Sequence, residues 1–110
     1  MRDEKRKRLE AKGWRIGNAR EFLGLTDEEA AYIEVKLRLA SSLRVRRQRL
    51  RLTQADLARL LRSSQSRVAK MEIGDPSVSL DLLVRSLLAL GASTVELSRI
   101  ISARRPAPAA

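Results

Sequence analysis

The sequence predicts an all-α fold of five helices, of which the first is long and preceded by an N-terminal extension. The 110 residues are 44% hydrophobic, which is enough for one domain with a modest core. Apolar residues recur at the helical spacings of three and four, and no segment of any length alternates as a strand does. Residues that cap helices precede the apolar runs, so the sequence also predicts the limits of each helix.

The two ends of the chain differ in composition from its middle. Residues 1–12 mix both signs of charge, and the segment after them combines glycines with Trp14 and Phe22, two of the three aromatic residues. We expect an arm and docking segment over residues 1–25, in which the arm either contacts phosphate or stays solvated. The helical domain is predicted over residues 26–102, and residues 103–110 are predicted to form a disordered tail.

The first helix is predicted to begin at a capping box of Thr26 and Glu29 and to continue to about Leu50. It carries two apolar stripes, and we expect the first to pack against the following helices. That stripe contains Tyr32, Val35, Leu39, Leu43 and Leu50. The second contains Ala30, Ile33, Leu37 and Ala40. This second stripe either receives the Trp14 and Phe22 segment or a partner chain, or shares one core with the first.

Two short helices are predicted next, separated by about three residues. Thr53 caps the first, over residues 54–60 or 54–61, and Ser64 caps the second, over residues 65–72 or 65–73, which Gly74 ends. The inward residues are Leu57, Ala58, Leu61, Val68 and Met71. Such a pair is the helix-turn-helix geometry, in which the first helix crosses the DNA backbone and the second lies in the major groove.

The fourth and fifth helices complete the domain. Ser79 caps the fourth, over residues 80–90, and a capping box of Ser93 and Glu96 opens the fifth. The apolar surface of these two helices exceeds what one small core needs, so we expect it to build a homodimer interface. It includes Leu82, Leu88 and Leu97.

Charge predicts the partner. Lys and Arg outnumber Asp and Glu by 23 to 13, and between Arg44 and Lys70 nine basic residues face the single acid Asp56. The outward residues of the second short helix include no acid and are Gln65, Ser66, Arg67 and Lys70. A surface that meets polyphosphate has this character, so the predicted partner is double-stranded DNA. A solvated basic face is the alternative.

Several classes of function are disfavoured by what the sequence lacks. There is no Cys and no His, so the commonest nucleophiles, general bases and zinc ligands are missing, and we expect no catalytic residue, metal or cofactor. The acids cluster at predicted helix starts, where capping explains them. No stretch approaches the ~20 apolar residues of a membrane span, so we expect no membrane contact and a cytoplasmic location.

A set of residues between Leu52 and Ala92 matches the pattern of a known family. These are Thr53-Gln54, Leu57-Ala58, Ser64-Gln65-Ser66, Val68, Met71 and Glu72-x-Gly74, followed by a leucine-rich helix that ends in Leu90-Gly91. On these residues the chain resembles the Cro/C1-type (XRE) helix-turn-helix family, which includes lambdoid phage repressors and HigA-type antitoxins. The resemblance covers roughly half of the chain and implies a lambda-repressor-like DNA-binding domain.

The resemblance also implies roles for individual residues. Gln54 would hold a phosphate with its backbone N–H and side chain, Gln65 and Ser66 would read bases, and Lys70 would lie further along the same groove-facing side. Chemistry agrees for Gln65, because a glutamine amide matches the paired donor and acceptor of adenine. Further phosphate contacts are expected from Arg67, which could also reach a base, and from Arg62 and Arg51.

One ion pair and one departure from the family complete the site. The resemblance implies that Arg47 pairs with Glu72, which makes this acid structural. Arg62 stands in the family's usual glycine position, and Ser63 stands where a small apolar residue is common. A residue with a side chain at positive φ costs about 1 kcal/mol, so the turn could differ from the family's and place Arg62 over a phosphate.

These expectations combine into a function. One recognition helix contacts few base pairs, so we expect a homodimeric repressor on a palindromic operator. The resemblance to HigA implies the antitoxin of a type II toxin–antitoxin system, which represses its own operon and binds a toxin protein. The surface for the toxin would include Trp14, Phe22, Ile33 and Leu37. The alternatives are a stand-alone repressor and a protein-interaction module that uses the fold without reading DNA.

Overall fold

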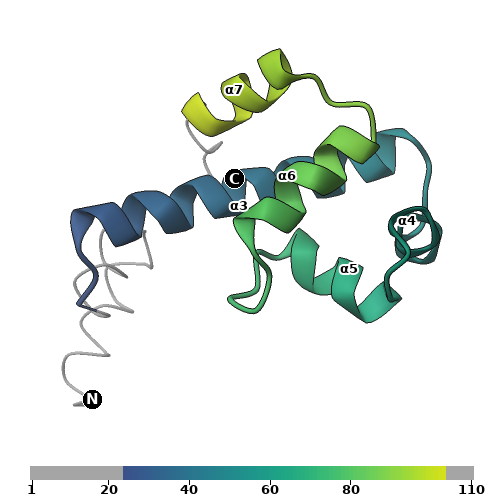
Figure 1. Cartoon of the computed structure of the whole chain (residues 1–110), viewed down its shortest axis with the longest axis horizontal. Coiled ribbons are helices and arrows are strands. Elements are labelled where there is room, and N and C mark those ends of the chain that lie inside the picture. The colour runs from purple at the N-terminus through teal and green to yellow at the C-terminus, as the bar shows by residue number, and fades with distance from the viewer. Residues whose placement is uncertain (1–23, 104–110) are drawn as a thin grey trace, which may run out of the picture. The chain divides into compact units, whose positions relative to one another are not determined.

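The structure, a computed structural model, describes residues 24–103, and this part of the chain is helical with no strand. Its helices are α3 (Asp27–Arg49), α4 (Gln54–Leu61), α5 (Gln65–Glu72), α6 (Leu80–Ala89) and α7 (Thr94–Ser102), as Figure 1 shows. The predicted all-α fold and its five helices are confirmed. None of the described helices combines the length and the apolar character that crossing a membrane requires.

The chain divides into two compact units, Met1–Glu34 and Val35–Ala110, with the boundary inside α3. The residues predicted to contact DNA all belong to the second unit. In the first unit, Ile33 is half-buried. Trp14 and Phe22 lie outside the described residues, as do most of the predicted arm and tail.

Each helix begins at a hydroxyl side chain that accepts a hydrogen bond from a backbone N–H of its first turn. At α3, the Glu29 N–H donates to Thr26 Oγ1 and the Thr26 N–H donates to Glu29 Oε1, both at 3.1 Å. The same reciprocal box opens α4 and α7. The other caps, also at the predicted positions, are Thr53, Ser64, Ser79 and Ser93. Local sequence therefore determines where these helices start.

The core is built from one side of every helix. Its fully buried large side chains are Leu39, Leu43, Leu57, Val68, Met71, Leu83 and Leu87. The helices α4 and α5 pack directly against each other. In Figure 1, α5 and α7 lie on opposite sides of the pair formed by α3 and α6. The two ends of the domain consequently present separate surfaces.

Three apolar residues lie differently from their predicted places. Leu97, expected in a dimer surface, is only 9% exposed and belongs to the core, because α7 turns its Leu97 and Ile100 side toward the rest of the domain. Leu50, expected inward, is 50% exposed, since α3 ends at Arg49 and the helical phase of the stripe ends with it. Tyr32, from the same stripe, is 49% exposed.

The second apolar stripe of α3 meets the turn after α5. Gly74 has a φ of +67°, and a Cβ built there would lie 3.0 Å from Leu37 Cδ2 and 3.6 Å from Ala40 Cβ. Only a glycine fits this close approach without displacement. Ala40 is buried in the core cluster, so the interpretation with one shared core applies to it. Leu37 is half-buried beside the turn that ends α5.

Candidate nucleic-acid interface

The turn between α4 and α5 is closed by backbone hydrogen bonds. The Ser63 N–H donates to the Ala58 carbonyl at 2.8 Å, and the Arg62 N–H donates to the Arg59 carbonyl at 3.2 Å. Arg62 adopts the left-handed conformation, with φ 54° and ψ 48°. Its side chain is exposed. A cation therefore occupies the position that a glycine would hold without strain.

Helix α5 has one buried side and one exposed polar side. Ser64 caps it by accepting from the Arg67 N–H at 3.1 Å, and Val68 and Met71 are fully buried. The exposed residues are Gln65, Ser66, Arg67 and Lys70, and we call this set the α5 face. It carries two cations and no carboxylate. Its side chains can donate to phosphates and base edges.

The two acids that follow the α5 face in sequence are both engaged. Glu72 is turned inward, with 7% of its surface exposed. Asp75 accepts from the Ser77 N–H at 2.9 Å and from the Ser77 hydroxyl at 2.6 Å. Those bonds, with a smaller contribution from Lys70, lower the pKa of Asp75.

A buried polar network ties α3, α4 and α5 together. Arg47 Nε donates to Glu72 Oε2 at 2.5 Å, and Arg47 Nη2 donates to Glu72 Oε1 at 3.0 Å. The two side chains are 12% and 3% exposed. The third donor, Arg47 Nη1, reaches the Leu52 carbonyl at 2.8 Å. The hydrogen bond to Glu72 raises the pKa of Arg47. This network holds α5 in a fixed orientation against the end of α3.

Gln54 lies at the junction of that network and the exposed surface. Its side-chain amide donates to Glu72 Oε1 at 3.2 Å, a contact that the sequence did not indicate. Its backbone N–H lies in the first turn of α4, where amides have no partner inside the helix. The residue is therefore already oriented by Glu72, with a main-chain donor of the kind that binds phosphate.

The basic residues between Arg44 and Lys70 do not form one surface. Arg46 pairs with Glu96 of α7, and Arg59 pairs with Asp56. Arg51, with φ 58°, is exposed beyond the end of α3. The sequence did not indicate the Arg46 contact, because the capping box at Ser93 already explained the presence of Glu96. In the structure Glu96 both closes that capping box and pairs with Arg46. Within the described residues, no group of three or more acidic side chains could hold a metal ion.

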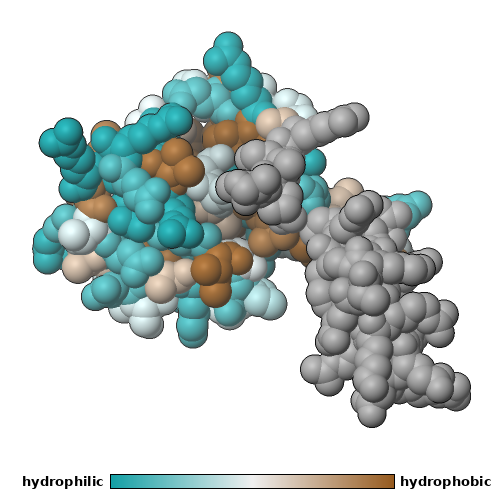
Figure 2. All heavy atoms as spheres, turned by 180° about the vertical axis from the view of Figure 1, so that it is seen from behind, coloured by the Kyte–Doolittle hydropathy of each residue, from teal (hydrophilic) through white to brown (hydrophobic). Residues whose placement is uncertain are grey.

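The apolar residues left exposed on α6 and α7 are fewer than the sequence indicated. Leu88 is 44% exposed, Val95 58% and Ile101 41%, whereas Leu82 is partly buried against the core. Figure 2 shows the molecule from behind, where hydrophobic residues form separate patches between hydrophilic ones. A dimer surface on α6 and α7 would have to use Leu88, Val95 and Ile101.

Comparison with known proteins agrees with this geometry. A family model described as "Helix-turn-helix domain" matches residues 38–100, which spans most of α3 and continues into α7. No match was found among curated proteins or among solved structures.

Proposed function

Because the chain belongs to this helix-turn-helix domain family, we propose that it is a sequence-specific DNA-binding repressor that reads its operator with the α5 face. The observation that carries the proposal is the acid-free face itself, exposed on a helix whose other side is buried and anchored by Arg47 and Glu72. A base reader must be held rigidly to discriminate, and this network supplies the rigidity. Gln65 and Ser66 read bases, and Lys70 extends the contact along the groove.

Phosphate contacts surround the base readers in this proposal. The contacts come from the backbone N–H of Gln54, a half-buried residue at the start of α4, and from the side chains of three exposed residues, Arg51, Arg62 and Arg67. Such contacts position the protein without conferring specificity. Each phosphate neutralised contributes about −0.9 to the log–log slope of affinity against salt. A homodimer on a palindromic operator doubles both the slope and the number of bases read.

Selection of bound genomic fragments tests the proposal. Wild-type protein is expected to enrich fragments that contain a palindrome with half-sites one helical turn apart, about 34 Å. The double variant Gln65→Ala, Lys70→Ala is then compared with Gln48→Ala, Arg85→Ala, which removes the same kinds of group from exposed positions on α3 and α6. The first pair should abolish sequence preference, and the second should keep it.

Two outcomes would overturn the assignment. If the palindrome is still preferred by the Gln65 and Lys70 double variant, the α5 face does not read bases. If the wild type retains no DNA even at low salt, a module that binds protein partners through the same fold is the better description.

The antitoxin role is the narrower form of this proposal and involves a second surface. Leu37 is half-buried and lies beside Gly74, so the proposed toxin surface relies on Trp14, Phe22 and Ile33. Co-expression with the product of the neighbouring gene tests it. We expect a co-eluting complex that Trp14→Ala, Phe22→Ala disrupts and Tyr32→Ala, at a half-exposed aromatic residue, leaves intact. Absence of a complex supports a stand-alone repressor.

A further inference from the structure

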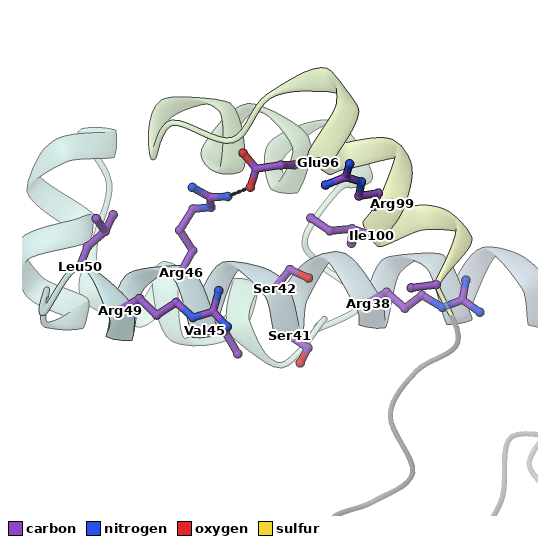
Figure 3. Close-up of a pocket in the computed structure, with 11 residues that line it drawn as sticks. Arg38, Ser41, Ser42, Val45, Arg46, Arg49, Leu50, Glu96, Arg99 and Ile100 are labelled. Atoms are coloured by element: carbon purple, nitrogen blue, oxygen red, sulfur yellow. Dashed lines mark hydrogen bonds and ion pairs between the residues drawn. The ribbon is translucent and has the colours of Figure 1, made fainter.

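A cavity of about 560 Å³ lies between α3 and α7, and we call it the α3–α7 pocket (Figure 3). Two contacts bridge the helices beside it. Arg46 forms an ion pair with Glu96, and Arg38 Nη1 donates to the Ile101 carbonyl at 2.9 Å. Figure 3 shows Ser42 and Ile100 between these two bridges. The volume falls within the range of sites for small organic molecules.

The lining of the pocket is cationic and apolar together. Its charged members are Arg38, Arg46, Arg49, Arg99 and Glu96, so positive charge exceeds negative. Arg49 and Arg99 form no ion pair within the described residues. The apolar members are Val45, Leu50 and Ile100, of which Val45 is 40% and Leu50 50% exposed. Charge and apolar area thus meet in one hollow.

We propose that the α3–α7 pocket binds a small organic anion with an apolar body. The anionic group contacts Arg49 or Arg99, because both line the pocket and a guanidinium group suits carboxylate, sulfonate or phosphate oxygens. The apolar body covers Val45, Leu50 and Ile100. The site is separate from the α5 face, since α5 and α7 lie on opposite sides of α3 and α6 (Figure 1). The pocket would therefore bind a ligand in addition to the proposed DNA, and its lining contains no residue of the α5 face.

Charge argues against the other occupants. A second copy of the chain seated through the same pocket would bring arginines against arginines, which is unfavourable. The chain's own ends are also basic: residues 1–23 contain more Lys and Arg than Asp and Glu, and residues 104–110 contain Arg104, Arg105 and no acid. An anionic small molecule is the occupant whose charge complements the lining.

A matched pair of fluorescent probes tests the proposal on the full chain. The anionic probe is 8-anilinonaphthalene-1-sulfonate, and the neutral probe is N-phenyl-1-naphthylamine, which has the same body without the sulfonate. We expect saturable binding of one sulfonate probe per chain, with the neutral probe about tenfold weaker. Backbone amide shifts should change at Ser41 and Ser42, which line the pocket.

Variants separate the pocket from a general charge effect. Arg49→Gln, Arg99→Gln should weaken the sulfonate probe about tenfold, and Arg44→Gln, at an exposed residue of α3 outside the lining, should not. Thermal unfolding checks that each variant is folded, and Ser42→Leu, which fills the hollow, gives a second route to loss of binding. Equal affinity for both probes, or unchanged binding by the Arg49 and Arg99 variant, would overturn the proposal. So would self-association that this variant strengthens, because a second copy would then be the occupant.

Discussion

The α5 face and the α3–α7 pocket both present cations, but the fold treats the two sets differently. On the α5 face, Arg67 and Lys70 are exposed, and rigidity comes from Arg47 and Glu72 behind them. In the pocket, one of the lining cations also holds the two helices together, because Arg46 of α3 pairs with Glu96 of α7. The α5 face is a protruding surface, which suits a long polyanion such as DNA, whereas the α3–α7 pocket is concave, which suits a small anion.

This difference shows that a run of basic residues in a sequence does not define one surface. Arg46 and Arg47 are neighbours in the chain, yet Arg46 reaches α7 and Arg47 reaches α5. Successive residues of a helix point about 100° apart, so one charged turn of α3 supplies both ends of the domain. A substitution at one of the two surfaces should therefore leave the other surface unchanged.

The largest effect is expected from breaking the network behind the α5 face. Glu72→Ala leaves the Arg47 guanidinium, whose side chain is 12% exposed, without its carboxylate, which should lower the free energy of unfolding by about 3–5 kcal/mol. Urea denaturation measures it. The control Asp81→Ala removes an exposed partner of Arg85, with side chains 76% and 77% exposed, and should change little. Equal losses in both variants would contradict the structural role of the network.

The local parts of this fold were predictable from the sequence, and the family resemblance also implied one tertiary contact, the Arg47–Glu72 pair, but the buried side of α7 was not predictable. Helix starts follow from side chains that bond the nearest backbone, as at Thr26 and Ser93, so sequence alone places them. The turn at Arg62 was expected to differ from the family's because of the strain, yet Arg62 keeps the left-handed conformation that a glycine would adopt there. Leu97 was misplaced because the apolar residues of α7 surround much of the helix, and only docking chooses the buried side. The base-reading roles of the α5 face stay predictions.

The second effect concerns the α7 side of the pocket. Leu97→Ala truncates a core side chain that is 9% exposed, and should cost about 2–3 kcal/mol of unfolding free energy. Leu88→Ala, at 44% exposure, should cost less than about 1 kcal/mol. At a temperature where the Leu97→Ala variant is folded, its DNA affinity should be unchanged, since Leu97 belongs to the core and the α5 face lies on the other side of α3 and α6. A larger loss at Leu88 would show that it lies in an interface.

A smaller effect is expected at Arg62, where two substitutions distinguish the strain of the turn from the role of the positive charge. Arg62→Gly removes the strain of a side chain at φ 54°, and the gain, less the added freedom of the unfolded glycine, should be about 0.5 kcal/mol. The same change removes the proposed phosphate contact, so the salt slope of DNA binding should become shallower by about 0.9 per protomer. Arg62→Asn, which tolerates this conformation, should weaken DNA binding similarly. A salt slope that stays at the wild-type value in both variants would show that Arg62 does not meet phosphate.

The smallest expected effect is the pH dependence of stability that comes from the capping acids of α4 and α7. Hydrogen bonding to the Thr53 backbone lowers the pKa of Asp56 at α4, and hydrogen bonding to the Ser93 backbone, with the Arg46 charge, lowers the pKa of Glu96 at α7. A carboxyl whose pKa is lower in the folded state stabilises the fold above its unfolded pKa, and that stability is lost as pH falls through the folded pKa. The urea concentration at the midpoint of unfolding should therefore decrease as the pH is lowered from about 5 to about 2. Asp56→Asn and Glu96→Gln should each make this fall shallower. Added salt should reduce the stability that Glu96 contributes above its unfolded pKa, because part of that contribution comes from the nearby charge of Arg46. If Glu96→Gln leaves the loss of stability at low pH unchanged, the Arg46–Glu96 ion pair does not stabilise the domain.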